Sequence, residues 1–232
     1  MNASVIRLRG IAAASLLAIG CAQAGDGAAG TLTVAALQGS YELKTWSGQA
    51  GDGAFDMISE RLKIGAGTLT FAPTFRGTGP FALAGDTLTV THGNGQEDVI
   101  QASFRDTGNT LTLVDEIGEE VATFVFVRRS GTGTSNEVTE ATLQGRYDLN
   151  AARSTANTLP HLDSGELEIS GSSMTTSLTF SQTRPYALVE DTIVLPETDG
   201  DTSRLRAHLS QDGNTLTLTS LEGRHTFVYA RR

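Results

Sequence analysis

The residue types that most often perform catalysis or bind metals are scattered along this sequence. The four histidines, His92, His161, His208 and His225, show no metal-ligand spacing such as His-x-x-x-His. The acidic run 197–201 lacks the twelve-residue loop with a terminal glutamate that an EF-hand calcium site needs. The sequence also has no G-x-S-x-G nucleophile elbow and no P-loop. We therefore expect no enzymatic activity, no metal site and no cofactor, and we interpret the histidines as surface or loop residues.

The single cysteine, Cys21, lies in a segment typical of an export signal. Arg7 and Arg9 precede an apolar run over 11–20, and residues 22–24 (AQA) offer an A-x-A cleavage position. We expect residues 1–24 to be a signal peptide and the mature protein to be periplasmic or extracellular. The residues before Cys21 also resemble a degenerate lipobox, so an outer-membrane lipoprotein anchored through Cys21 is the alternative. No apolar run approaches the roughly 20 residues of a transmembrane helix, and we expect no such segment.

The composition is that of an acidic, globular and turn-rich chain. Its 232 residues include 26 glycines, 39% are hydrophobic, and the formal net charge is −9. Nucleic-acid-binding proteins concentrate positive charge, so this balance argues against a nucleic-acid partner.

The chain repeats itself once. Residues 37–43 (LQGSYEL) are echoed by 143–149 (LQGRYDL), and 108–113 (GNTLTL) recur unchanged at 213–218. Both copies end alike, with FVFVRR at 124–129 and FVYARR at 227–232. We expect a flexible segment over 25–32, domains over 33–129 and 138–232, and a linker over 130–137.

The periodicity within each copy is that of half-buried strands. Apolar and polar residues alternate, as in Leu111-Thr112-Leu113, and turn signals recur every eight to twelve residues. About eight hairpin-linked strands per copy can close on themselves and so remove their edges. We expect an all-β protein of two tandem, small, antiparallel up-and-down β-barrels. A helical turn capped by Thr33 or Thr139 is expected before the first strand of each copy.

Each copy resembles a bacterial lipocalin-like (calycin-type) domain. The opening L-x-G-x-Y-x-L stands where lipocalins have Gly-x-Trp, and each copy ends in an aromatic strand followed by arginine. The resemblance implies that Tyr41 meets Arg128 or Arg129 at the closed end of its barrel, and that Tyr147 meets Arg231 or Arg232. Together with Gly39 and Gly145, these residues are expected to close the barrels and to have a structural role.

Apolar residues near the loop after the first strand of each copy are candidate ligand contacts. The two loops are expected over 47–59 and 153–164, and in lipocalin-like barrels the corresponding loop covers the open end. The alternative is that these side chains fold back to cap the barrel as satellite core. The candidates are Trp46, Phe55, Met57, Ile58, Leu159 and Leu162.

The last strand of each copy is apolar on both faces. We expect Val125, Val127, Val228 and Ala230 to pack between barrels or against a partner. The resemblance implies an exported, non-enzymatic protein that binds a small apolar ligand in or at the mouth of its barrels. The alternative is a filled-barrel structural or protein-interaction module, such as an adaptor or inhibitor, with an envelope protein as partner.

Overall fold

The computed structural model describes residues 32–47, 56–117, 120–131, 135–155, 161–196, 202–221 and 223–232. Within these ranges the chain forms strands and two four-residue helices, which confirms the expected all-β class. Neither of these helices has the length or hydropathy needed to span a bilayer.

The chain folds into two compact units that differ from the expected domains 33–129 and 138–232. The described part of the first unit is 56–58 and 74–180, and that of the second is 32–47, 59–73 and 181–232. Each unit therefore combines strands from both sequence repeats. The described residues of the segment expected to link two domains, 130–131 and 135–137, belong to the first unit.

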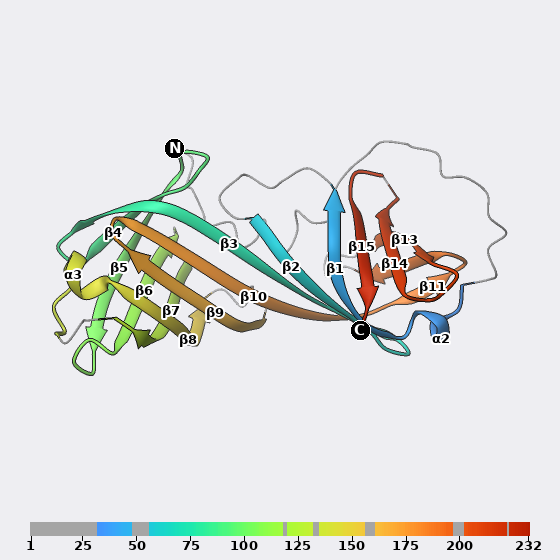
Figure 1. Cartoon of the computed structure of the whole chain (residues 1–232), viewed down its shortest axis with the longest axis horizontal. Coiled ribbons are helices and arrows are strands. Elements are labelled where there is room, and N and C mark those ends of the chain that lie inside the picture. The colour runs from blue at the N-terminus through green and yellow to red at the C-terminus, as the bar shows by residue number, and fades with distance from the viewer. Residues whose placement is uncertain are drawn as a thin grey trace. The chain divides into compact units, whose positions relative to one another are not determined.

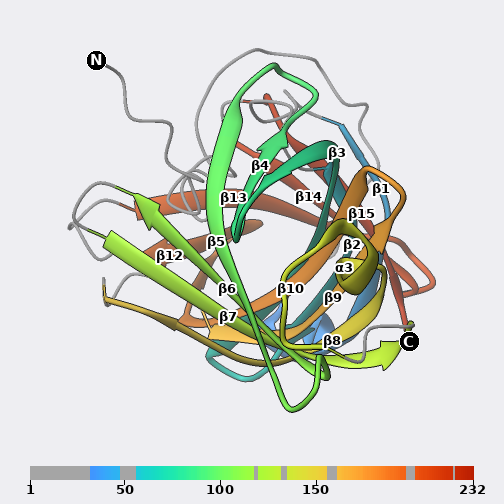
Figure 2. The ribbon, with the colours of Figure 1, turned by 90° about the vertical axis from the view of Figure 1, so that its left-hand side faces the viewer.

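The first unit is a closed, antiparallel barrel of eight strands. Its strands are neighbours in the order β10-β9-β8-β7-β6-β5-β4-β3, and a further pairing of β10 with β3 closes the ring. Figure 2 views this ring from the side that carries α3. The strands are β3 (Thr68–Ala84), β4 (Thr87–Thr91), β5 (Glu97–Arg105), β6 (Thr110–Ile117), β7 (Glu120–Ser130), β8 (Gly145–Ser154), β9 (His161–Ser170) and β10 (Ser173–Pro185).

Alternating side chains fill this barrel. On β5 each of Asp98, Ile100, Ala102 and Phe104 is buried, while the residues between them are exposed. Successive side chains of a strand point to opposite faces, so these four residues face the interior.

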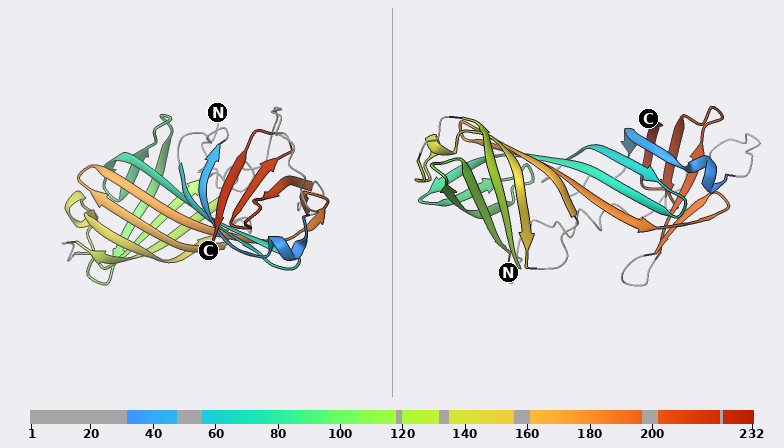
Figure 3. Two further views of the ribbon diagram at one scale, coloured as in Figure 1. Left: turned by 45° about the vertical axis from the view of Figure 1, so that its right-hand side comes forward. Right: turned by 90° about the horizontal axis from the view of Figure 1, so that it is seen from below.

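The second unit has a corresponding set of strands. Its order runs β3-β2-β1-β15-β14-β13-β12-β11, and β11 follows β10 after the single residue Tyr186. Figure 3 shows β1 beside β15, the pairing of the first described strand with the last. The strands not yet named are β1 (Gly39–Ser47), β2 (Asp56–Ile64), β11 (Ala187–Val189), β12 (Thr192–Pro196), β13 (Thr202–Leu209), β14 (Thr215–Ser220) and β15 (Thr226–Arg231).

The strands β3 and β10 explain why the units differ from the repeats. Each is one long strand that contributes residues to both units, and the two are paired (Figure 1). At the centre of the pairing Thr74 Oγ1 lies 2.9 Å from Oγ1 of Thr179, its own equivalent in the second repeat. The pairing is thus pseudo-symmetric, and the two repeats have exchanged their first two strands and the beginning of the third.

A helical turn precedes the first strand of each repeat, as expected. These turns are α2 (Val34–Leu37) and α3 (Glu140–Leu143), capped by the hydroxyl groups of Thr33 and Thr139. Leu37 and Leu143, at the ends of these helices, are fully buried in the cores of the second and first unit. Gly145 follows α3 with φ +146°, and a Cβ there would lie 2.3 Å from the Ser130 carbonyl oxygen, so only glycine fits.

Candidate functional site

One end of the first barrel is closed by Arg128. Its guanidinium carbon lies 4.7 Å from the centre of the Tyr147 ring, and its three nitrogens donate to the carbonyl oxygens of Gly108, Thr142 and Gln144 at 2.6–2.9 Å. The Tyr147 hydroxyl donates to the Leu143 carbonyl at 2.7 Å. All three guanidinium nitrogens of Arg128 and the Tyr147 hydroxyl therefore have partners within the described part of the barrel.

Arg231 makes the corresponding contact in the second unit. Its guanidinium carbon lies 5.3 Å from the centre of the Tyr41 ring, and Nη2 donates to the Tyr41 hydroxyl at 2.7 Å. The expected contact between ring and arginine therefore exists, but the expected pairing of Tyr41 with Arg128 and of Tyr147 with Arg231 is wrong. The reason is the strand exchange, because β1 pairs with β15 and β7 pairs with β8.

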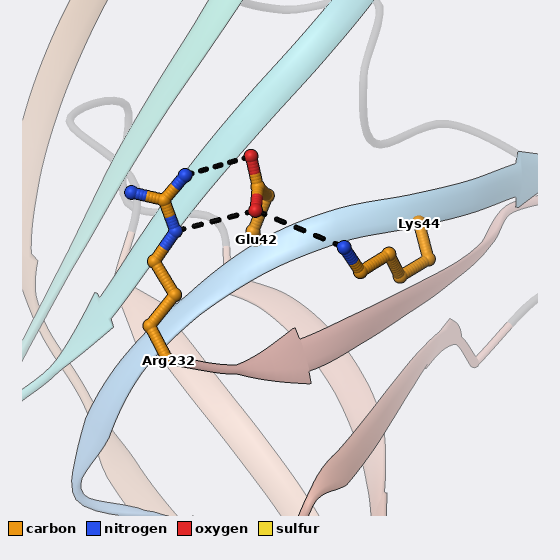
Figure 4. A network of polar contacts seen from close by, with 3 residues as sticks. All are labelled: Glu42, Lys44 and Arg232. Atoms are coloured by element: carbon orange, nitrogen blue, oxygen red, sulfur yellow. Dashed lines mark hydrogen bonds and ion pairs between the residues drawn. The ribbon is translucent and has the colours of Figure 1, made fainter.

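The exchange also creates an ion-pair group on the outer face of β1 and β15. Arg232 donates to both carboxylate oxygens of Glu42, at 2.8 and 3.2 Å, and Lys44 Nζ lies 3.8 Å from the same carboxylate (Figure 4). The hydrogen bonds from Arg232 hold the pKa of Glu42 below its usual value. All three side chains are accessible to solvent, so the group adds little to stability.

The interior of the first barrel contains a cavity of about 70 Å³. Its wall is formed by inward-facing residues of β3 to β7 and of β10, and most of these side chains are apolar. Hydrophobic and aromatic walls with a few polar groups are typical of small-molecule sites. The apolar lining residues are Phe75, Val90, Ile100, Leu113, Phe124, Phe126, Met174, Leu178 and Phe180.

Three polar residues line the cavity, namely Thr176 on β10 and the pair His92 and Asp98. His92 Nε2 lies 2.5 Å from Asp98 Oδ2, and both side chains line the cavity. Asp115 follows Leu113 on the inward face of β6 and is 4% exposed, and its Oδ2 has no hydrogen-bond partner. Burial, and then the nearby Asp98 carboxylate, raise the pKa of Asp115 to about 6, while His92 opposes the shift.

The second unit carries uncharged serines at the positions equivalent to Asp98 and Asp115. Val90 pairs with Asp98 in the first unit as Leu195 pairs with Ser203 in the second. In the same way Ile100 pairs with Asp115, and Leu205 pairs with Ser220. Since the second unit forms the same strands with serines here, the fold itself does not require the two aspartates.

The second unit buries a different acid. The hydroxyl of Tyr229 donates to Glu60 Oε1 at 2.5 Å, and both residues are buried. Burial raises the pKa of Glu60 to about 7, and the Tyr229 hydrogen bond partly opposes the shift. In the first unit, Gly165 has the strand position of Glu60, and Phe126 has that of Tyr229. A Cβ at Gly165 would lie 2.7 Å from Leu178 Cδ2, so a glutamate there would have to displace the Leu178 side chain.

Two of the histidines lie in loops, which the expectation of surface or loop residues allows, but their side chains are not on the surface. His92 lines the cavity, and His225 is buried in the second unit with its ring 6.5 Å from that of Phe227. His161 and His208 are exposed, as expected.

Of the residues expected to contact a ligand, those that the structure describes do not line the cavity. Met57 and Ile58 lie in β2 and Leu162 lies in β9, so the structure corrects their placement in loops. Leu162 packs against a small cluster of Phe75, Leu178 and Phe180, which agrees with the satellite-core alternative. Trp46 is half-buried in β1, and Ile58 is 47% exposed. Phe55, Leu159 and the lipidation candidate Cys21 lie outside the described residues.

The outer residues of the last strands differ in exposure. Val127 is 42% exposed, whereas Val125, Val228 and Ala230 are half-buried. Their packing between barrels or against a partner stays a prediction.

Our sequence analysis missed Asp98 and Asp115, although the sequence contains a signal that could have identified them. Asp98 and Asp115 each continue an alternating series of inward residues, Ile100-Ala102-Phe104 on β5 and Leu111-Leu113 on β6. A charged residue at an inward position is rare unless it is paired, so it marks a site worth inspecting.

No protein-family model, curated protein or solved structure matched this chain. Among the described residues, no group of three or more histidine, cysteine, aspartate or glutamate side chains is arranged to hold a metal ion.

Proposed function

We propose that this chain is an exported, non-enzymatic, lipocalin-like protein that binds a small apolar molecule inside its first barrel. The observation that supports the proposal is the cavity between β3–β7 and β10, with its apolar wall and its polar part at His92 and Asp98. The ligand would lie between these strands, in contact with other residues than the loop candidates Met57, Ile58 and Leu162.

The size of the cavity limits the ligand. Pockets for drug-sized molecules usually measure about 300–1,000 Å³, whereas this cavity measures about 70 Å³. The proposed ligand is therefore a molecule with a short alkyl chain.

The proposal includes a second barrel. The second unit follows the same strand order as the first, and Thr70 Oγ1 lies 2.8 Å from Thr183 Oγ1 where β3 and β10 pair within it. We propose that this pairing closes the second unit in the same way, which gives two barrels with different interiors.

Titration of the full chain with n-hexanol tests the ligand-binding proposal. We expect saturable chemical-shift changes at the methyl groups of Ile100 and Leu113, which line the cavity. The variant Leu113→Phe should weaken hexanol binding because the larger ring occupies part of the cavity.

The matched control is Leu218→Phe, at the equivalent, fully buried position of the second unit. This variant should leave hexanol binding in the first unit unchanged. Hexanol shifts that are absent, do not saturate or are unaffected by Leu113→Phe would contradict the proposal and favour the filled-barrel interaction module.

A further inference from the structure

We propose that the polar part of the cavity recognises a protonated primary amine, so that the ligand is a small alkylammonium compound. This inference rests on the proposed function, because it assumes that the cavity accepts a ligand. It adds the chemical class of the head group and assigns its recognition to Asp98 and Asp115.

One buried hydrogen-bond acceptor near the cavity receives no hydrogen bond from the described residues. Asp98 lines the cavity and is paired with His92. Asp115, the next inward residue of β6 after the cavity-lining Leu113, is 4% exposed, and its Oδ2 has no hydrogen-bond partner among the described residues. A buried carboxylate oxygen without a donor is costly, because water is lost and nothing replaces it. A ligand that brings N–H donors and a positive charge would remove this cost.

The balance of charge favours a cation over an anion or a neutral ligand. The two carboxyl groups lie on the inward faces of the neighbouring strands β5 and β6, where Asp98 is two residues along β5 from Ile100, the partner of Asp115. His92 is close to both, and the repulsion from Asp98 helps to raise the pKa of Asp115. A ligand carboxylate would add a third negative group to this interior. An ammonium group would attract both aspartates at once.

Two further observations narrow the choice of cation. The absence of a metal-binding arrangement among the described residues makes an organic cation the better fit. An ammonium group is compact and has three donors, whereas a guanidinium group is larger and planar, so the small cavity favours the amine.

A comparison of three ligands with the same chain length tests the inference on the unmodified full chain. n-Hexylamine, n-hexanol and hexanoate are titrated near neutral pH, and the Ile100 and Leu113 methyl shifts are followed. We expect n-hexylamine to bind about tenfold more tightly than n-hexanol, since charge-assisted hydrogen bonds are about twice as strong as neutral ones. Hexanoate should bind most weakly.

The possible outcomes separate the two proposals. If n-hexanol and n-hexylamine bind equally, or hexanoate binds best, the amine inference is wrong while the proposed function stands. If none of the three ligands binds at the cavity methyl groups, the proposed function itself is wrong.

Variants of the two aspartates test whether these residues recognise the amine. Asp115→Asn removes one charge with little change of shape, and it should abolish the preference for n-hexylamine while n-hexanol still binds. Asp98→Asn should act in the same direction and serves as a second variant if the first does not fold. The matched control is Glu60→Gln, which neutralises the buried acid of the second unit and should leave the amine preference unchanged. A preference that survives both aspartate variants would overturn the assignment.

Discussion

Buried carboxyl groups are the least expected residues in this molecule. An ionised carboxylate inside a protein must recover the interactions with water that it has lost. Glu60 does so through one hydrogen bond from Tyr229, and Asp98 does so through His92. Asp115 has one oxygen with no such partner. These differences make the three acids respond differently to pH and to ligands.

Glu60 makes the second unit more stable in mild acid than in mild base. The folded-state pKa of Glu60 is raised from 4.5 to about 7, so the folded state binds a proton more tightly than the unfolded state does. This stabilising contribution is complete below the unfolded pKa and is lost as the pH rises towards 7, by about 3 kcal/mol at most. Urea unfolding near pH 5 and pH 8, followed by the fluorescence of Trp46 in β1, measures the change.

Glu60→Gln is the control for this effect. The glutamine can still accept a hydrogen bond from Tyr229 but cannot titrate, so its unfolding should depend less on pH between these values. Equal pH dependence in the variant and the unmodified chain would mean that Glu60 is not the group responsible.

At the scale of elements, the contact between tyrosine and arginine uses the same residue types in both units but different hydrogen bonds. Arg128 donates to three carbonyl groups through three different nitrogens. The side-chain hydrogen bonds of Arg231 come from Nη2 alone, and its buried Nε has no partner, among the described residues. A lysine ammonium group can take over the hydrogen bonds that a single guanidinium nitrogen makes. It cannot reproduce the separate, coplanar donors of a whole guanidinium group.

Arg128→Lys should therefore cost more stability than Arg231→Lys. We expect a loss of about 2–4 kcal/mol for the first variant, because two charge-assisted hydrogen bonds disappear, and a smaller loss for the second. Native-state hydrogen exchange of β7 and β8 measures the first unit, and that of β1 and β15 measures the second. Equal losses in the two units would show that the number of donating nitrogens does not matter here.

Most of the strands and both helical turns were predictable from the sequence. Alternation predicted the strands, and Thr33 and Thr139 predicted the capped helical turns. The loop contacts failed because β2 begins at Asp56, so Met57 and Ile58 are strand residues. Large side chains at inward positions favoured the alternative of a filled barrel. The cavity depends on how the side chains of six strands fit together, and the sequence of a single strand does not determine that fit.

At the scale of the whole molecule, the sequence could not decide which strands pair. β7 and β15 both end in an apolar segment followed by two arginines, so either strand can pair with β1 or β8 and place an arginine over the tyrosine. The choice depends on the middle of β3 and β10. A hairpin there would close each repeat on itself, whereas the continuous strands seen here exchange the strands that precede them.

The strand exchange is the central claim, because it brings β8–β10 to β3–β7 and so forms the barrel that contains the cavity. The most direct test is the pattern of nuclear Overhauser effects in the monomeric full chain. We predict effects between the Tyr41 ring and the Arg231 side chain, and between the Tyr147 ring and the Arg128 side chain. Effects that join Tyr41 to Arg128 and Tyr147 to Arg231 would show that each repeat closes on itself and would contradict the account.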